Sequence, residues 1–158
     1  LSWQEETEGM REITYRDIMI RDLANLNRWK FAINQAVEEL ETLNAEFAAI
    51  KATNYDKLPS GSGDNTQEEK LLSAIAKKTK LEAWIKATQK HIENMESLLG
   101  MLSEEDKLII ERTVINRKKN AEDDVAEEIG IERRQVYNRK NDILHQLCQM
   151  RFGQGYQP

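Results

Sequence analysis

The sequence predicts an all-α protein in which a long N-terminal helical hairpin or coiled coil is joined to a C-terminal helix-turn-helix domain. Three observations predict this fold. The 158 residues include only 2 Pro and 7 Gly, and residues that favour helix are abundant. Apolar residues recur every seven positions in two long stretches, and a Pro-Ser-Gly-Ser-Gly-Asp segment separates these stretches. Clusters of β-branched or aromatic residues are few, so we expect no sheet.

The first long helix is expected to follow a short N-terminal segment. Residues 1–18 are predicted to be flexible or partly helical, because polar and charged residues dominate their first half. An apolar heptad stripe begins near Met19. Its two sets, offset by three residues, are Leu26, Ile33, Leu40 and Phe47, and Trp29, Ala36, Leu43 and Ile50.

A linker over residues 54–66 is predicted to precede a second helix of similar length. The second stripe, which Lys78 and Thr88 interrupt, consists of Leu71, Ile85, Ile92 and Leu99, and of Ala74, Leu81, Met95 and Leu102. Each stripe spans roughly 48 Å at about 1.5 Å per residue, as an antiparallel hairpin requires. We therefore assign residues 19–101 to a hairpin or coiled-coil domain. The pattern does not distinguish a hairpin within one chain from a coiled coil between chains.

The core of this domain, or the interface of an oligomer, is predicted to contain ten residues. They are Leu26, Trp29, Ile33, Leu40, Leu43, Phe47, Leu81, Ile85, Ile92 and Leu99. Trp29 and Trp84 are interpreted as core packing rather than as a pair that stacks on a ligand.

A separate domain is predicted over residues 102–152. Ser103 followed by three acidic residues is typical of a helix start, because the hydroxyl caps the helix and the acids complement its dipole. The apolar spacing then changes from heptads to three short helices. Residues 153–158 are predicted to form a flexible tail.

The segment 125–140 fits a helix-turn-helix. Such a motif needs a small residue where its helices cross, a Gly able to adopt a left-handed conformation at the turn, and apolar residues that pin both helices. The residues that meet these needs are Val125, Ala126, Ile129, Gly130, Ile131 and Val136. A small helical bundle without a binding role is the alternative interpretation.

The distribution of charge favours a nucleic-acid partner more than the net charge of −5 does. Residues 122–128 hold five acids and no base, whereas residues 133–141 hold four bases and no acid. A second basic cluster precedes the motif at 117–119. The predicted phosphate-contacting residues are Arg117, Lys118, Lys119, Arg139 and Lys140.

The second helix of such a motif enters the major groove by its N-terminal half. Because Val136 faces the core, residues on the opposite side of that helix should point outward. Arginine can bind guanine, asparagine can bind adenine, and tyrosine can reach a phosphate or a thymine methyl group. The predicted base-contacting residues are Arg133, Arg134, Tyr137, Asn138 and Asn141.

These motifs carry a resemblance to a known family. Leu-Ser-Glu-Glu-Asp-Lys at 102–107 and Arg-Gln-Val-Tyr-Asn-Arg-Lys at 134–140 follow a long helical region and its linker. The arrangement resembles the RinA/ArpU-type phage transcriptional regulators of Gram-positive hosts, specifically over residues 100–150 and only in architecture before that. Their C-terminal domain is similar to region 4 of a sigma factor, which reads the −35 promoter element.

The resemblance implies a transcription activator that binds upstream of phage packaging and structural genes and contacts host RNA polymerase. The sequence departs from the sigma-type pattern at two places. Lys119-Asn120-Ala121 stands where a Gly- or Ser-rich turn is usual, and Glu132 stands where a Ser or Thr cap is usual.

Other classes of protein are disfavoured. No stretch approaches the ~20 apolar residues of a membrane span and no signal peptide opens the chain, so a cytoplasmic protein is expected. The resemblance implies that this cytoplasm is that of a bacterial host cell. One cysteine and two histidines offer no disulfide and no metal site, and no phosphate loop or nucleophile elbow occurs. We expect no enzyme activity, no cofactor and no small-molecule substrate. His91 is expected at the solvent-exposed surface, His145 at the periphery, and Cys148 in the core.

The expected partners are double-stranded DNA and a second copy of the chain. Two alternatives stay open. A phage small terminase subunit also joins a helix-turn-helix to oligomerising helices, although it usually places the DNA-binding part first. A helical adaptor could instead bind a basic protein through residues 1–56, which carry 11 acidic and 6 basic groups.

Overall fold

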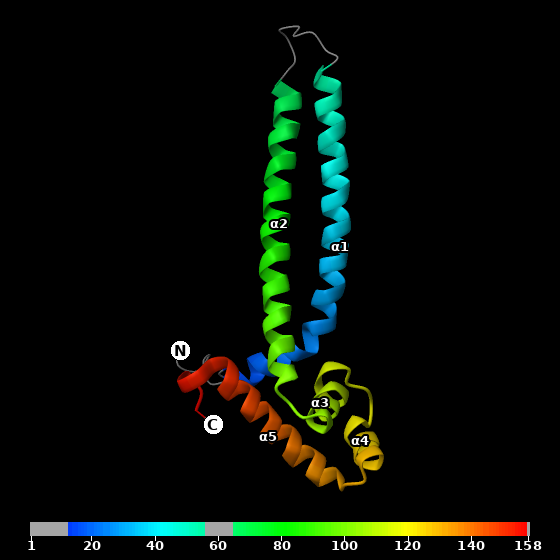
Figure 1. The fold of residues 1–158 in the computed structure, drawn as a ribbon, viewed down its shortest axis with the longest axis vertical. Coiled ribbons are helices and arrows are strands. Elements are labelled where there is room, and N and C mark those ends of the chain that lie inside the picture. Colours follow the sequence, from blue (N-terminus) through cyan, green and yellow to red (C-terminus); the bar gives the residue numbers. More distant parts are fainter. Residues whose placement is uncertain (1–12, 56–64, 158) are drawn as a thin grey trace, which may run out of the picture. The chain divides into compact units, whose positions relative to one another are not determined.

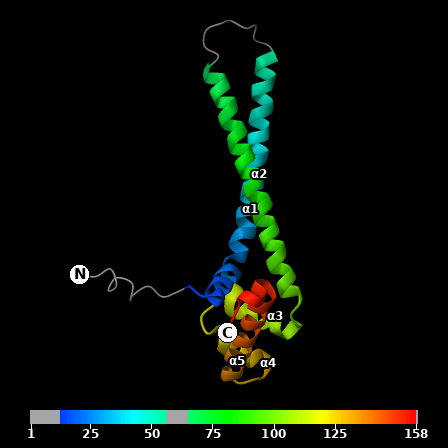
Figure 2. The ribbon, with the colours of Figure 1, turned by 90° about the vertical axis from the view of Figure 1, so that its left-hand side faces the viewer.

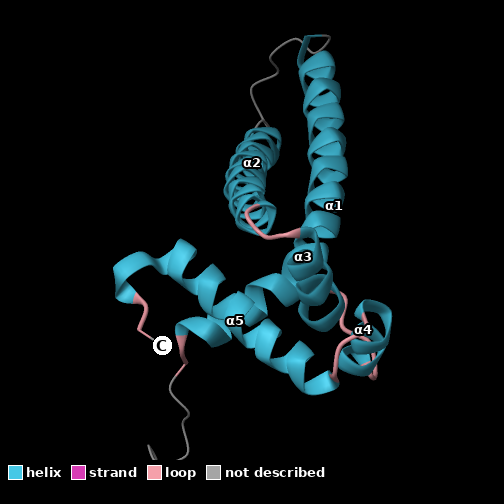
Figure 3. Ribbon diagram, turned by 60° about the horizontal axis from the view of Figure 1, so that its bottom comes forward, coloured by secondary structure: helices cyan, strands magenta, loops and turns pink. Residues whose placement is uncertain are grey.

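The computed structural model describes residues 13–55 and 65–157, and within these ranges every regular element is helical. The elements are α1 (Tyr15–Tyr55), α2 (Asn65–Gly100), α3 (Glu104–Ile110), the π-helical turn η1 (Glu111–Ile115), α4 (Ala121–Ile129), α5 (Arg133–Phe152) and the 3₁₀ turn η2 (Gly153–Gly155). Figure 3 shows helices joined by loops, without strands in the described part of the chain. The prediction of an all-α fold is confirmed. None of the described helices combines the length and apolar character of a membrane span.

The chain divides into two compact units. Residues Arg28–Glu93 form the hairpin unit, whereas Leu1–Asn27 and Asn94–Pro158 belong to the C-terminal unit. This division differs from the predicted boundaries of 19–101 and 102–152, because the start of α1 and the end of α2 belong with the C-terminal helices. Met19, Leu23 and Met95 are 0–1% exposed there. Two helices alone cannot enclose side chains so completely.

The hairpin unit consists of two antiparallel helices whose apolar stripes face each other. Figure 1 shows α1 and α2 side by side, and in the turned view of Figure 2 they cross. The Trp29 ring packs edge-on against His91, with 4.6 Å between ring centroids. Closer to the C-terminal end of α1 and the N-terminal end of α2, the Lys78 ammonium lies 5.8 Å from the centre of the Phe47 ring. The heptad stripes therefore meet within one chain.

Burial in the hairpin unit follows the heptads, with two corrections to the prediction. Ile33, Ile85 and Ile92 are buried, while the outer core positions of the hairpin are half-buried because each helix covers only one side of its partner. The half-buried members of the predicted core are Trp29, Leu40, Leu43, Phe47 and Leu81. Leu26 and Leu99 lie in the C-terminal unit.

The two corrections concern aromatic rings. Trp84 is 42% exposed and does not belong to the core, because it immediately precedes core position 85 and so lies on the flank of α2. His91 is half-buried against Trp29 rather than solvent-exposed.

Helix α1 begins earlier than the heptad stripe indicates. The Asp17 amide donates to Thr14 Oγ1 at 3.2 Å, and the Thr14 amide donates to Asp17 Oδ2 at 3.1 Å. This reciprocal pair is a capping box, and it fixes the first turn from Tyr15. At its other end α1 includes residues 54 and 55, and α2 begins at Asn65. Both helices therefore extend into the predicted 54–66 linker. The remainder of that linker and residues 1–12 and 158 lie outside the described residues.

The C-terminal unit is built around one apolar core. Its most completely buried apolar side chains are Met19, Leu23, Met95, Ile109, Ile110, Val125, Val136, Leu144, Leu147 and Cys148. The predicted cap of α3 is confirmed, since the Asp106 amide donates to Ser103 Oγ at 3.2 Å. The predicted packing of Cys148 is also confirmed, and burial raises the pKa of its thiol.

The end of the chain is packed rather than flexible over its described residues. After the 3₁₀ turn η2, the hydroxyl of Tyr156 lies 3.0 Å from His145 Nδ1. The Tyr156 ring also meets Tyr15 edge-on, with 6.4 Å between centroids, and Phe152 stacks on Tyr15 at 4.7 Å. These aromatic contacts order residues 153–157, and they make His145 part of the packing rather than peripheral.

Candidate nucleic-acid interface

The turn between α4 and α5 has the local features that the sequence predicts. Gly130 adopts φ 79°, and its amide donates to the Ala126 carbonyl at 2.9 Å. The Ile131 amide donates to the same carbonyl at 3.0 Å. On the two sides of the turn, Ala126 and Val136 are buried. Residues 130–132 therefore connect the two helices, with glycine at the position where other residues would be strained.

At the start of helix α5, the side-chain amide of Gln135 caps a backbone amide, where a Ser or Thr cap is usual. The Glu132 amide donates to Gln135 Oε1 at 3.0 Å. This bond satisfies one of the free amides at the start of the helix, so Glu132 is compatible with a well-formed first turn.

The free face of α5 carries four polar side chains in its first two turns. Arg133, Arg134, Tyr137 and Asn138 are all exposed, whereas Val136 on the opposite side is fully buried. Arg134 and Asn138 make no hydrogen bond or ion pair with any described residue. These two side chains are therefore available to a ligand.

Arg133 and Tyr137 interact with each other along this face. The guanidinium lies 5.6 Å from the centre of the Tyr137 ring and 3.4 Å from its hydroxyl. Arg133 Nε also lies 3.3 Å from Asp123 Oδ1 of α4. The hydrogen bond to Tyr137 and then the charge of Asp123 raise the pKa of Arg133. Both side chains are thus held in position at the surface.

Asn141, the fifth predicted base contact, is engaged elsewhere. Its Oδ1 accepts a hydrogen bond from Arg16 Nη2 at the start of α1. Asn141 also lines a cavity of about 830 Å³ together with Tyr15, His145 and Tyr156. The start of α1 covers α5 at this level, so the free face ends after its first two turns.

Arg117 and Lys140, predicted to contact phosphate, converge on one buried carboxylate. Arg117 donates to both oxygens of Glu122, at 2.6 and 3.2 Å, and the Lys140 ammonium lies 3.5 Å away from Oε1. The Glu122 side chain is only 3% exposed. Burial alone would raise the pKa of its carboxyl group, but the Arg117 hydrogen bond and the two positive charges outweigh burial and lower it.

Arg139 is likewise committed to the protein. It donates to Glu105 and, at 2.9 Å, to Asp106 Oδ1, and so joins α5 to the first turn of α3. The Glu105 hydrogen bond is the main cause of its raised pKa. In the structure Arg117, Arg139 and Lys140 are thus all paired with acidic residues of α3 and α4.

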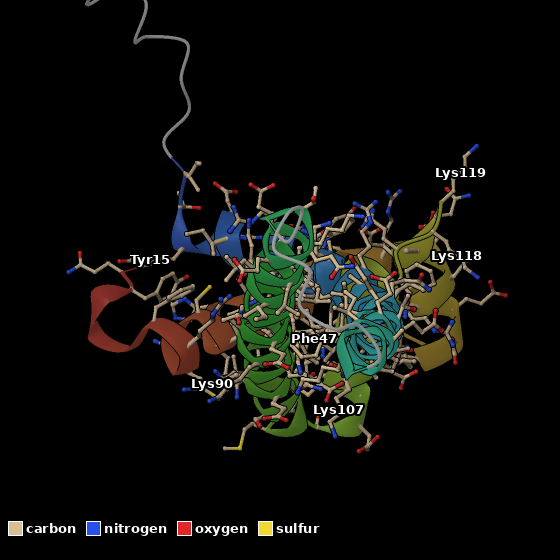
Figure 4. The ribbon with its side chains drawn as sticks, turned by 90° about the horizontal axis from the view of Figure 1, so that it is seen from above. Tyr15, Phe47, Lys90, Lys107, Lys118 and Lys119 are labelled. Carbon is tan, nitrogen blue, oxygen red and sulfur yellow. The ribbon has the colours of Figure 1, made fainter. Side chains whose placement is uncertain are left out.

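In the loop between η1 and α4, Lys118 and Lys119 are unpaired cations, unlike Arg117. Both are exposed in the loop between η1 and α4 and form no ion pair with the described residues. Figure 4 shows their side chains pointing away from the body of the unit. Because Glu122 binds both Arg117 of this loop and Lys140 of α5, the loop is fixed beside α5.

A buried ion pair joins two helices that are far apart in the sequence. Asp22 of α1 is 5% exposed, and its Oδ2 lies 2.7 Å from Arg151 Nη2 of α5. No sequence signal links positions so far apart. The nearest hint is an acid within an apolar stretch of a helix, flanked here by Met19, Leu23 and Leu26.

Comparison of the chain with protein-family models, curated proteins and solved structures finds no match. The described residues also contain no group of three His, Cys, Asp or Glu side chains that could hold a metal ion.

Proposed function

We propose that this protein is a sequence-specific double-stranded DNA-binding transcriptional regulator, an activator of phage late genes acting in the cytoplasm of the host cell. The observation that carries the proposal is the tight turn at Gly130, followed by a helix whose first two turns present Arg133, Arg134, Tyr137 and Asn138 to solvent. A helix with this polar face at its N-terminal half suits the major groove. The resemblance to RinA/ArpU-type regulators supports late-gene activation and contact with RNA polymerase.

The structure supports a division of labour within this surface. Arg134 and Asn138, which lack protein partners among the described residues, read guanine and adenine edges. Lys118 and Lys119 contact phosphate and position the unit on the duplex. Arg117, Arg139 and Lys140 act on DNA binding only by holding the helices together. A surface with so few free cations gives specific binding with a shallow salt dependence.

Substitutions separate these roles. Arg134→Ala should remove about 1–3 kcal/mol of discrimination between a specific duplex and a random-sequence duplex. Lys118→Ala should weaken binding to both duplexes alike and reduce the salt slope by about 1. Fluorescence anisotropy with the full chain at several salt concentrations measures both effects.

The matched control is Lys107→Ala, which removes a lysine of α3 that pairs with Glu104 at 3.2 Å. It should bind as the parent does. Equal affinities and equal salt slopes for the parent, Arg134→Ala and Lys118→Ala would contradict the proposed interface.

A further inference from the structure

Asp123 differs from the other paired acids of α4, because its partner lies on the exposed face of α5. Its Oδ1 is 3.3 Å from Arg133 Nε, and the Asp123 and Arg133 side chains are 50% and 60% exposed. Glu122 is buried, and Glu128 pairs instead with Arg112 of η1. Asp123 therefore places a negative charge at the edge of the surface that we propose to bind DNA.

The stability of α5 does not account for this ion pair. Arg133 is the first residue of the helix, where the partial positive charge of the helix dipole disfavours a cation. The first turn of α5 contains no acidic residue that would offset this effect. An ion pair as exposed as that of Arg133 with Asp123 contributes little to folding. A role in binding accounts for the pair better than a role in folding.

The contacts of Arg133 leave part of its guanidinium open. Asp123 lies beside Nε, and Nη2 donates to the Tyr137 hydroxyl at the long distance of 3.4 Å. Nη1 has no partner among the described residues. Because each Nη atom carries two N–H donors, both retain a donor for a ligand. Two such donors side by side match the O6 and N7 acceptors of guanine.

The next residue, Arg134, provides a contrast in charge. Arg134 forms no ion pair or hydrogen bond within the described part of the chain, so its charge is available to a phosphate as well as to a base. The charge of Arg133 is balanced by Asp123. Nonspecific binding depends on cations that neutralise phosphates, whereas a guanine edge is bound through hydrogen bonds. Arg133 is thus a weak ligand for phosphate that keeps its donors for guanine.

We propose that Asp123 is a positioning residue that directs Arg133 to a guanine and weakens binding to DNA of unrelated sequence. Its carboxylate holds the guanidinium from the Nε side. Its negative charge also repels the phosphates of a duplex that offers no guanine at that place. This role rests on the proposed function, within which it identifies the source of sequence preference at one base pair.

Asp123→Asn should change specific and nonspecific binding in opposite directions. Sequencing of the duplexes that the full chain selects from a random pool measures base preference, and Arg133→Ala should abolish the preference at one guanine position. Asp123→Asn should weaken that preference about tenfold. Fluorescence anisotropy with a random-sequence duplex should instead show binding about threefold tighter than that of the parent, with a salt slope steeper by about 1.

A purely structural role of Asp123 would not produce these opposite changes. A damaged fold would weaken binding to every duplex, and thermal unfolding followed by circular dichroism would reveal it. Asp123→Asn combined with Arg133→Ala should show the base preference of Arg133→Ala alone, because Asp123 acts through Arg133. Asp123→Glu keeps the charge and should keep nonspecific binding close to that of the parent.

The matched control is Asp124→Asn, which removes the same charge from the next residue in the first turn of α4. Asp124 precedes Glu128 by four residues, so it lies on the side of α4 that pairs with η1. This variant should keep the guanine preference and the salt slope of the parent.

Two kinds of failure can be told apart. A parent that recovers no consensus would overturn both the proposed function and the role of Asp123. If the parent recovers a consensus, three results would overturn the role of Asp123 alone. They are a consensus with no position sensitive to Arg133→Ala, a guanine preference unchanged in Asp123→Asn, or equal effects of Asp123→Asn and Asp124→Asn.

Discussion

At the scale of single residues, Glu122 accounts for much of the unusual charge pattern. Its buried carboxylate accepts two hydrogen bonds from Arg117 and lies close to Lys140, and so links the loop after η1 with α5. Acidic and basic blocks that are adjacent in the sequence therefore neutralise each other in space. A basic cluster in a sequence does not reveal which of its members are already paired.

Replacement of Glu122 tests this role. Glu122→Gln should lower the free energy of unfolding by about 2 kcal/mol near neutral pH. This is less than the ~3–5 kcal/mol expected when a buried charge is left without its partner, because Arg117 can reach solvent. The control is Glu128→Gln on the same helix, whose partner Arg112 lies 3.3 Å away at the surface. That change should cost about 0–1 kcal/mol. Urea denaturation followed by circular dichroism measures both.

The pH dependence of the same variant has a defined sign. Because the pKa of Glu122 is lowered in the folded protein, its contribution is fully present above the ordinary carboxyl pKa of about 4 and is lost as the pH falls through the folded value. The difference in unfolding free energy between the parent and Glu122→Gln should therefore shrink in acid. A difference that is constant from neutral to acidic pH would contradict the assigned ion pairing.

At the scale of elements, the turn between α4 and α5 depends on one glycine. Gly130→Ala should cost about 1–2 kcal/mol, because φ 79° is unfavourable for a residue with a side chain. No atom lies within 4 Å of the added Cβ, so the cost is that of the backbone alone. Thermal unfolding measures the effect.

Gly100, the last residue of α2, is the matched control for this substitution. It also has open space around an added Cβ, but its φ is not positive. Gly100→Ala should be neutral or slightly stabilising. Equal destabilisation by both substitutions would mean that the left-handed turn is not the critical feature.

The sequence predicted the elements better than their limits. Heptads predicted the antiparallel stripes, and Ser103 and Gly130 predicted a cap and a turn, because each of these signals is local. The heptad pattern does not predict the early start of α1, although Thr14 and Asp17 form a capping box there. The packed end of the chain was missed because Tyr156 is ordered by Tyr15 and His145, which are distant or inconspicuous in the sequence.

At the scale of the whole molecule, the unit boundaries could not be predicted from composition. Residues 15–27 belong to the same helix as the heptad stripe. Nevertheless, Arg16 donates a hydrogen bond to Asn141 of α5, and Asp22 forms an ion pair with Arg151 of α5. A helix can thus belong to one unit at its start and to another along its length. The hydrogen bond from Arg16 to Asn141, a predicted base-contacting residue, could be revealed only by the spatial arrangement.

The central proposal is that the first two turns of α5 read a DNA sequence. Selection of bound duplexes from a random pool at near-physiological salt tests it most directly, with the full chain as the bait. The account predicts enrichment of a consensus, and loss of its specific positions when the selection is repeated with Arg134→Ala and Asn138→Ala. Recovery of unenriched, random duplexes by the parent protein would contradict it.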